Sequence, residues 1–73
     1  GVMKEVTITT EFIKLQDLLK FAGLVETGGE AKERVQAGEA LVNGEVCAQR
    51  GRKIRPGDQG RFNGETLTVK YAD

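Results

Sequence analysis

The 73-residue sequence has no histidine, no tryptophan, one cysteine and one proline. A single cysteine cannot form a disulfide within the chain, and without histidine the common zinc sites lack ligands. We therefore expect neither a disulfide framework nor a bound metal or other cofactor. No apolar run approaches the roughly 20 residues of a membrane-spanning helix. A lone thiol suits a reducing compartment, so we expect a cytoplasmic protein that does not enter a membrane.

Residues that serve in catalysis are also scarce. The chain has no histidine, its one cysteine has no evident partner, and no pair of carboxylates stands at a recognisable spacing. A nucleophile, a base and an orienting group cannot be assembled from these residues. We therefore predict that the chain is not an enzyme.

The charges balance over the whole chain but not locally. Eleven basic and eleven acidic residues give a net charge of zero, yet Arg50, Arg52, Lys53 and Arg55 lie within six residues. A local positive surface attracts phosphate groups, and arginine binds them through two parallel hydrogen bonds. This cluster predicts a polyanionic partner; the alternative is a solvated loop between strands. If the segment is extended, Arg50 and Arg52 share one side of it.

The first half of the chain predicts one strand and two helices. Residues 5–9 alternate between apolar and polar side chains, as a half-buried strand does. From Ile13 onward apolar residues recur at helical spacing, and Gly23 ends this first helix. Thr27 and Glu30 match a capping box at the start of the second helix, in which each side chain binds the other residue's backbone N–H.

The second half predicts short strands joined by tight turns. Asn43-Gly44 and Asn63-Gly64 are typical of two-residue hairpin turns, because both central positions of a type I′ turn have positive φ. Pro56-Gly57 predicts a type II turn. The order of elements indicates an α+β domain in which a two-helix unit packs against a small antiparallel β-sheet. The expected core consists of Leu15, Leu18, Leu19, Ala31, Val35, Leu41, Val46, Ile54, Leu67 and Val69.

Taken in order, these motifs resemble the S-four RNA-binding domain, which is named after ribosomal small-subunit protein four and is also called the alpha-L motif. The resemblance covers about residues 13–60. It is carried by Lys14-Leu15, Gly23-Leu24, Glu30-Ala31-Lys32, Val42-Asn43-Gly44 and Ile54-Arg55-Pro56-Gly57-Asp58. The Thr-Gly-Gly and Arg-Gly-Arg-Lys runs are similar to those of small stand-alone bacterial members, which have no catalytic domain. The resemblance thus implies that residues 1–73 form a single RNA-binding domain.

The resemblance further implies that the helix pair and the adjoining loop bind structured RNA, such as ribosomal or transfer RNA. The partner would be free RNA, a ribosome or a ribosomal subunit, and the protein a monomer. Gly28 stands where many members have an arginine, and Glu33 where a basic or neutral residue is frequent, so the basic loop must contribute more. The candidate RNA-binding residues are Lys14, Lys20, Thr27, Gly28, Gly29, Lys32, Asn43, Arg50, Arg52, Lys53 and Arg55.

The second helix offers a possible anion site of its own. Its first-turn amides, unobstructed at Gly28 and Gly29, would hold a phosphate with Lys32 alongside; the alternative is a tight interhelical turn. The four aromatic residues are mostly assigned to the core, which leaves no stacking platform for single strands, so we expect recognition of RNA shape and backbone. A protein-interaction module and a DNA-binding accessory protein are the alternative functions.

Overall fold

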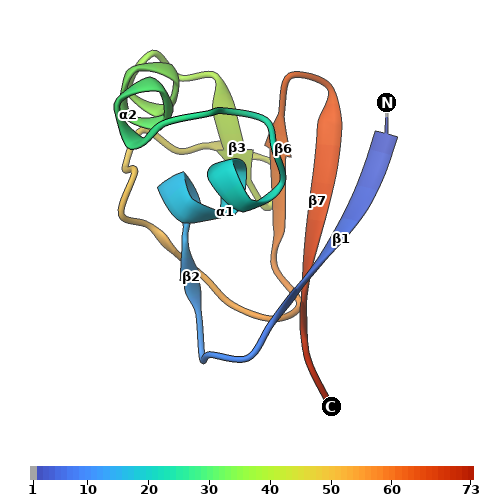
Figure 1. The fold of residues 1–73 in the computed structure, drawn as a ribbon. Coiled ribbons are helices and arrows are strands. Elements are labelled where there is room, and N and C mark those ends of the chain that lie inside the picture. Colours follow the sequence, from blue (N-terminus) through green and yellow to red (C-terminus); the bar gives the residue numbers. More distant parts are fainter. Residues whose placement is uncertain (1) are drawn as a thin grey trace.

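The computed structural model describes residues 2–73 of the chain. Five strands form one sheet in the order β1-β7-β6-β3-β4, and β2 pairs with β5 in a separate two-stranded sheet. Both helices lie on the same side of the larger sheet (Figure 1), which confirms the α+β class. In chain order the elements are β1 (Val2–Ile8), β2 (Ile13–Lys14), α1 (Leu15–Phe21), α2 (Gly28–Gln36), β3 (Ala40–Val42), β4 (Glu45–Val46), β5 (Lys53–Ile54), β6 (Gln59–Phe62) and β7 (Glu65–Tyr71).

The larger sheet is mixed, whereas the sequence predicted an antiparallel one. Strands β3, β4, β6 and β7 pair antiparallel, but β1 lies parallel to β7, with Val6 beside Val69. These two strands come from opposite ends of the chain, so no hairpin turn fixes their relative direction. Alternation of apolar and polar residues identifies a strand without specifying its partner.

One cluster of buried apolar residues fills the space between the helices and the sheet. Helix α1 approaches β6 closely: a Cβ atom added at Gly60 would lie 3.3 Å from Leu18 Cδ2, so glycine permits this packing. No polar or charged residue within residues 2–73 is buried. The cluster consists of Val6, Ile8, Leu15, Leu18, Leu19, Val25, Ala31, Val35, Ala40, Val42, Cys47, Ile54, Phe62, Leu67 and Val69.

Two predicted core residues lie outside this cluster. Leu41 is half-buried and Val46 is 64% exposed. They are register partners in the β3–β4 hairpin and therefore share one face of the sheet, while Ala40 and Cys47 are buried on the other. The prediction was wrong for this pair because apolar residues follow one another here without alternation, which leaves the inward face undetermined.

The predicted turns are confirmed. Asn43 and Asn63 have φ of 50° and 52°, each followed by a glycine with positive φ, and Gly23 ends α1 with φ of 76°. Helix α1 begins only at Leu15, because Ile13 and Lys14 are extended and pair with β5.

The cap of α2 is confirmed in one half and corrected in the other. Thr27 Oγ1 accepts a hydrogen bond from the Glu30 N–H at 3.0 Å, as predicted. The Glu30 carboxylate, however, accepts from the Glu26 N–H at 2.8 Å and not from Thr27. The carboxylate thus reaches one residue further back and fixes the chain that enters the helix.

Only one of the four aromatic residues is buried, contrary to the prediction that most of them belong to the core. Phe62 is buried, Phe12 is half-buried, and Phe21 and Tyr71 are 68% and 55% exposed. Tyr71 lies on the same side of β7 as the buried Val69, but it is the last residue of the strand. This end of β7 continues past the helices (Figure 1). None of the helices in residues 2–73 has the length and apolar character needed to cross a membrane.

Candidate nucleic-acid interface

The backbone of the basic loop, residues 50–55, is bound to the beginning of α1. Helix α1 has no side-chain cap. Instead, the Leu15 N–H donates to the Arg52 carbonyl oxygen at 2.9 Å, and the Gln16 N–H donates to the Arg50 carbonyl oxygen at 3.0 Å. The first N–H groups of a helix have no partner within it, so the loop supplies the missing acceptors. The loop backbone is fixed while the side chains of Arg50 and Arg52 remain exposed.

This attachment shapes the loop as a turn. The Arg52 N–H donates to the Gln49 carbonyl oxygen at 3.1 Å, closing a turn around Arg50 and Gly51. The segment is therefore not extended, so the expected alternation that would place Arg50 and Arg52 on one side does not apply. The loop turns because its carbonyl oxygens accept hydrogen bonds from the first N–H groups of α1. The alternation of residues within the loop gives no sign of this contact with α1.

Two lysines face each other where β2 pairs with β5. Lys14 and Lys53 are register partners, and the Lys53 ammonium lies 4.8 Å from the centre of the Phe12 ring. The pairing of β2 with β5 and the bonds from Leu15 and Gln16 to the loop carbonyls bring the backbones of four basic residues together. We call these residues, Lys14, Arg50, Arg52 and Lys53, the cation cluster. None of these four makes an ion pair with another residue in the range 2–73. Like charges placed opposite each other destabilise a strand pair, so folding alone does not favour this arrangement.

The Asp58 carboxylate accepts hydrogen bonds that order the Pro-Gly turn after Arg55. The Arg55 N–H donates to Asp58 Oδ2 at 2.8 Å, and this bond, followed by the one from the Asn43 side chain, holds the pKa of Asp58 below its ordinary value of 3.8. Asn43 Nδ2 donates to Asp58 Oδ1 at 3.1 Å, while Asn43 Oδ1 accepts from the Gln59 N–H at 3.0 Å. Both polar groups of Asn43 are thus used within the fold, so its side chain positions the turn.

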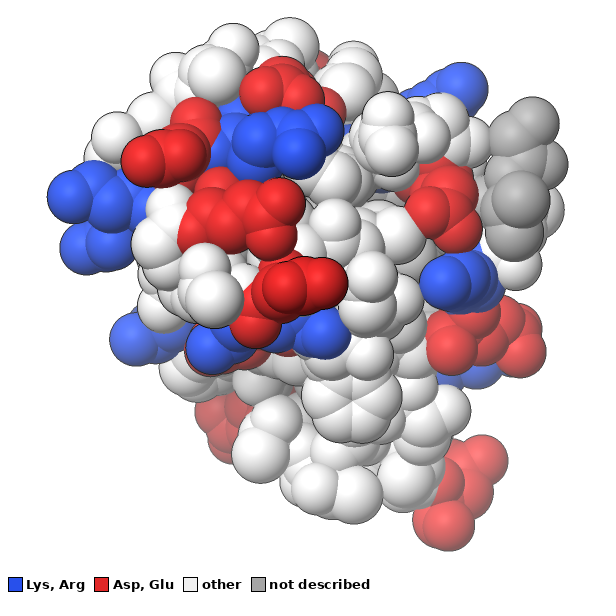
Figure 2. All heavy atoms as spheres, turned by 45° about the horizontal axis from the view of Figure 1, so that its top comes forward, with Lys and Arg blue, Asp and Glu red and all other residues white. Residues whose placement is uncertain are grey.

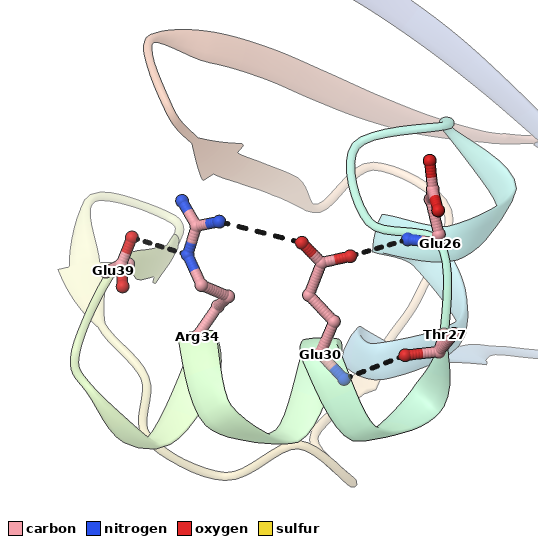
Figure 3. Close-up of polar contacts among 5 residues, drawn as sticks. All are labelled: Glu26, Thr27, Glu30, Arg34 and Glu39. Carbon is pink, nitrogen blue, oxygen red and sulfur yellow. Dashed lines mark hydrogen bonds and ion pairs between the residues drawn. The ribbon is translucent and has the colours of Figure 1, made fainter.

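Helix α2 presents a different electrostatic surface. Arg34 lies between two carboxylates, 2.8 Å from Glu39 and 3.8 Å from Glu30 (Figure 3). Its guanidinium also lies 5.0 Å from the centre of the Phe62 ring. On the side of the molecule shown in Figure 2, acidic and basic side chains alternate around the α2 end. The basic charge of this helix is therefore largely compensated by neighbouring acids.

The first turn of α2 is nevertheless open. A Cβ atom added at Gly28 would meet nothing within 4 Å, and one at Gly29 would meet only Thr27 Oγ1 at 3.9 Å. Within residues 2–73 the N–H groups of these two glycines have no hydrogen-bond acceptor, and Lys32 is exposed without an ion pair. The first-turn amides are therefore unobstructed, and the neighbouring Glu30 adds a negative charge to this turn.

All the candidate residues named from the sequence are exposed, but the structure does not bring them all together. Lys14 joins the arginines of the basic loop. Lys20 lies at the opposite end of α1 and pairs with Asp17 at 3.6 Å. The candidates of α2 lie on a separate element. Residues 2–73 contain no group of side chains suited to hold a metal ion.

Sequence reasoning missed two residues that support the site. Phe12 was given no role beyond the general expectation that most aromatic residues belong to the core, yet its ring lies under the Lys53 ammonium. Asp58 was noted as part of a turn motif and in fact orders the end of the basic loop. The Pro-Gly-Asp sequence was a usable signal for Asp58, because aspartate commonly accepts hydrogen bonds from the backbone of its own turn. No local signal pairs Phe12 with Lys53.

Comparison with known proteins places the chain in a family. The family model described as the S4 domain matches residues 6–70, a range that includes both helices and the basic loop. The chain is also 43% identical over 53 residues to the probable ribosome maturation protein RlbA of Bacillus subtilis (strain 168), an alignment that covers 73% of this chain and 75% of that protein. Both matches support an RNA-binding or ribosome-related role. This chain therefore belongs to the S4 domain family of RNA-binding domains.

Proposed function

We propose that the chain is a non-catalytic protein that binds structured RNA through phosphate contacts from the basic loop and Lys14. The observation that carries this proposal is the cluster of Lys14, Arg50, Arg52 and Lys53, none of which forms an ion pair with an acid in residues 2–73. Repulsion within such a cluster costs stability in the free protein, and bound phosphates would relieve it. The fixed backbone beneath the arginines lowers the entropy lost when they bind.

The contacts define the kind of RNA that fits. Arginine and lysine contacts to phosphate set the position of a nucleic acid without reading its sequence, and folded RNA is recognised mainly by shape and backbone. The open first turn of α2, with Lys32, adds a second and weaker contact, because Glu30 already lies beside it. The relative's name connects it with ribosome maturation, so ribosomal RNA or a ribosomal subunit is our proposed partner, bound by one copy of the chain.

A pair of double variants tests where the RNA binds. Replacing Arg52 and Lys53 by glutamine removes two charges from the basic loop. The matched control replaces Lys4 and Lys70, which lie on the paired strands β1 and β7. Affinities for two hairpin RNAs of unrelated sequence are measured by fluorescence anisotropy at several salt concentrations. We expect the loop variant to lower the affinity for both RNAs by similar factors. The slope of log affinity against log salt concentration should become shallower by about 0.7 to 0.9 per lost contact.

The outcomes separate the functional classes. Equal loss of affinity in both double variants would mean that attraction is diffuse over the protein. If neither variant loses affinity, RNA binding through this loop is refuted and a protein-interaction module becomes the better hypothesis. The same hairpins made of DNA should bind more weakly, because DNA lacks the 2′-hydroxyl groups and the A-form shape; equal binding would favour a general nucleic-acid-binding protein.

A further inference from the structure

A shallow hollow of about 320 Å³ lies beside the basic loop at the edge of the larger sheet. Its walls are formed by β4 and by the segment that leads from β4 into the basic loop. Arg52 lies on its rim and is also a member of the cation cluster, so the hollow adjoins the proposed RNA-binding surface. Its size is at the lower limit of ordinary small-ligand sites, which are about 300 to 1,000 Å³.

The lining combines apolar surface with unused polar groups. Val46 is 64% exposed and gives the hollow an aliphatic wall. Glu45, Gln49 and Arg52 supply a carboxylate, an amide and a guanidinium. None of these three side chains makes a hydrogen bond or ion pair with another residue in the described range 2–73. The hollow therefore presents a cation, an acceptor and an apolar wall together.

We infer that this hollow receives one unpaired nucleotide of the RNA held by the basic loop, an inference that rests on the proposed function. Arg52 binds the phosphate of that nucleotide, and the base lies against Val46. Glu45 accepts a hydrogen bond from an exocyclic amino group, as acidic side chains do when they read cytosine. Bases in bulges and loops are free to leave the stack and enter such sites, whereas bases of a continuous duplex are not.

This arrangement predicts a choice among bases. Adenine, cytosine and guanine each carry an exocyclic amino group that Glu45 can accept from. Uracil has only one N–H, and carbonyl oxygens on both sides of it would repel the carboxylate. The protein should therefore prefer an RNA hairpin with a bulged adenosine, cytidine or guanosine over the same hairpin without a bulge, and a bulged uridine should give little gain.

The test measures the affinity of the full chain for five hairpins by fluorescence anisotropy at one salt concentration. Four hairpins carry a single bulged nucleotide, one for each base, and the fifth is fully paired. We expect the bulged adenosine, cytidine and guanosine hairpins to bind about five-fold more tightly than the paired one, a factor that corresponds to burying a few tens of Å² of apolar surface.

Three substitutions identify the hollow as the source of this preference. Val46→Ser removes the exposed aliphatic wall and should abolish the preference for bulged RNA while leaving affinity for the paired hairpin unchanged. Met3→Ser is the matched control, since Met3 is also exposed, at 71%, but lies on β1 at the opposite edge of the sheet. Glu45→Gln should bring the bulged uridine hairpin to the affinity of the others, because the amide donates as well as accepts.

Several results would overturn the inference, and they differ from failure of the proposed function. If the parent binds bulged and paired hairpins equally, or if Val46→Ser retains the preference, the hollow receives no nucleotide, although RNA binding stands. If no hairpin binds at all, both proposals are refuted. If Val46→Ser weakens only the attachment to ribosomal subunits and not to naked hairpins, the hollow contacts protein and the nucleotide inference is wrong.

Discussion

Helix α2 and the basic loop hold their positive charges in opposite ways. Arg34 on α2 is held by the carboxylates of Glu30 and Glu39, so its charge is compensated. In the basic loop, hydrogen bonds to α1 fix the backbone around Arg50 and Arg52, and no acid pairs with their side chains within residues 2–73. An arginine held by acids contributes to folding, whereas one presented from a fixed backbone keeps its full charge for a partner.

The comparison also explains why family resemblance alone does not locate the interface. Both candidate surfaces, the basic loop and the first turn of α2, lie within the S4 domain match. Ion pairing distinguishes them. We therefore assign the larger share of RNA affinity to the basic loop and a smaller share to the first turn of α2.

The largest expected effect comes from removing the support that both surfaces share. Ile54 lies within the basic loop and is fully buried in the common core. Ile54→Ala should lower the free energy of unfolding by about 2 to 5 kcal/mol, because the substitution leaves a cavity. Leu41→Ala, at a half-buried position, should cost clearly less. Urea denaturation followed by circular dichroism gives the free energy of unfolding of both variants. If both lose the same free energy, the assignment of Leu41 to the less buried face of β3 is wrong.

A charge-matched pair separates the two surfaces directly. Arg50→Gln should weaken RNA binding and reduce the salt slope by about 0.7 to 0.9 with little change in stability, since one phosphate contact is lost. Arg34→Gln should instead lower the free energy of unfolding by roughly 1 kcal/mol, through its ion pairs and its contact with Phe62, and leave RNA affinity nearly intact. Anisotropy and urea midpoints are measured on both variants. Similar binding losses would refute the distinction.

A smaller effect is expected at the start of α2. Gly29→Glu adds a negative charge at an exposed first-turn position with room for a side chain. A phosphate bound there would be repelled, and affinity for hairpin RNA should fall about two- to five-fold, in line with about 0.3 to 1 kcal/mol for a charge at a helix terminus. Folding should be intact by circular dichroism. A variant that binds RNA as tightly as the parent would remove α2 from the interface.

The parts of the fold that could be predicted from sequence are those set by near neighbours. Asn43-Gly44 and Asn63-Gly64 form hairpin turns because asparagine and glycine accept positive φ, whatever surrounds them. Thr27 caps α2 because its acceptor lies only three residues from Glu30. The apolar spacing of α1 likewise identified its buried residues.

The parts that could not be predicted depend on pairing between distant segments. The direction of β1 beside β7 and the inward side of β3 follow from strand register, which no local pattern determines. The same limit applied to the site. Counting charges located the basic loop, but sequence could not show that Arg34 is compensated by acids or that Lys53 lies over Phe12.

The smallest expected effect concerns pH and tests how the end of the basic loop is held. Hydrogen bonds from the Arg55 N–H and then from Asn43 lower the pKa of Asp58. A carboxyl whose pKa is lower in the folded state contributes stability that is present above its ordinary pKa and is lost as pH falls through the folded value. Asp58→Asn cannot titrate. The stability difference between parent and variant should thus be constant near neutral pH and shrink as pH falls below about 4.

Urea midpoints of parent and Asp58→Asn between neutral and acidic pH give this difference, and a gap that stays constant down to the lowest pH would contradict the role of Asp58. A second variant separates the contribution of Asn43 to the lowered pKa of Asp58 from that of the Arg55 N–H. Asn43→Gly keeps the positive φ that the hairpin needs but removes the amide that donates to Asp58 Oδ1. Nuclear magnetic resonance titration of the Asp58 carboxyl should then show its pKa raised only part of the way toward 3.8, because the stronger bond from the Arg55 N–H remains. An unchanged pKa would mean that the backbone of the turn alone orders this end of the loop.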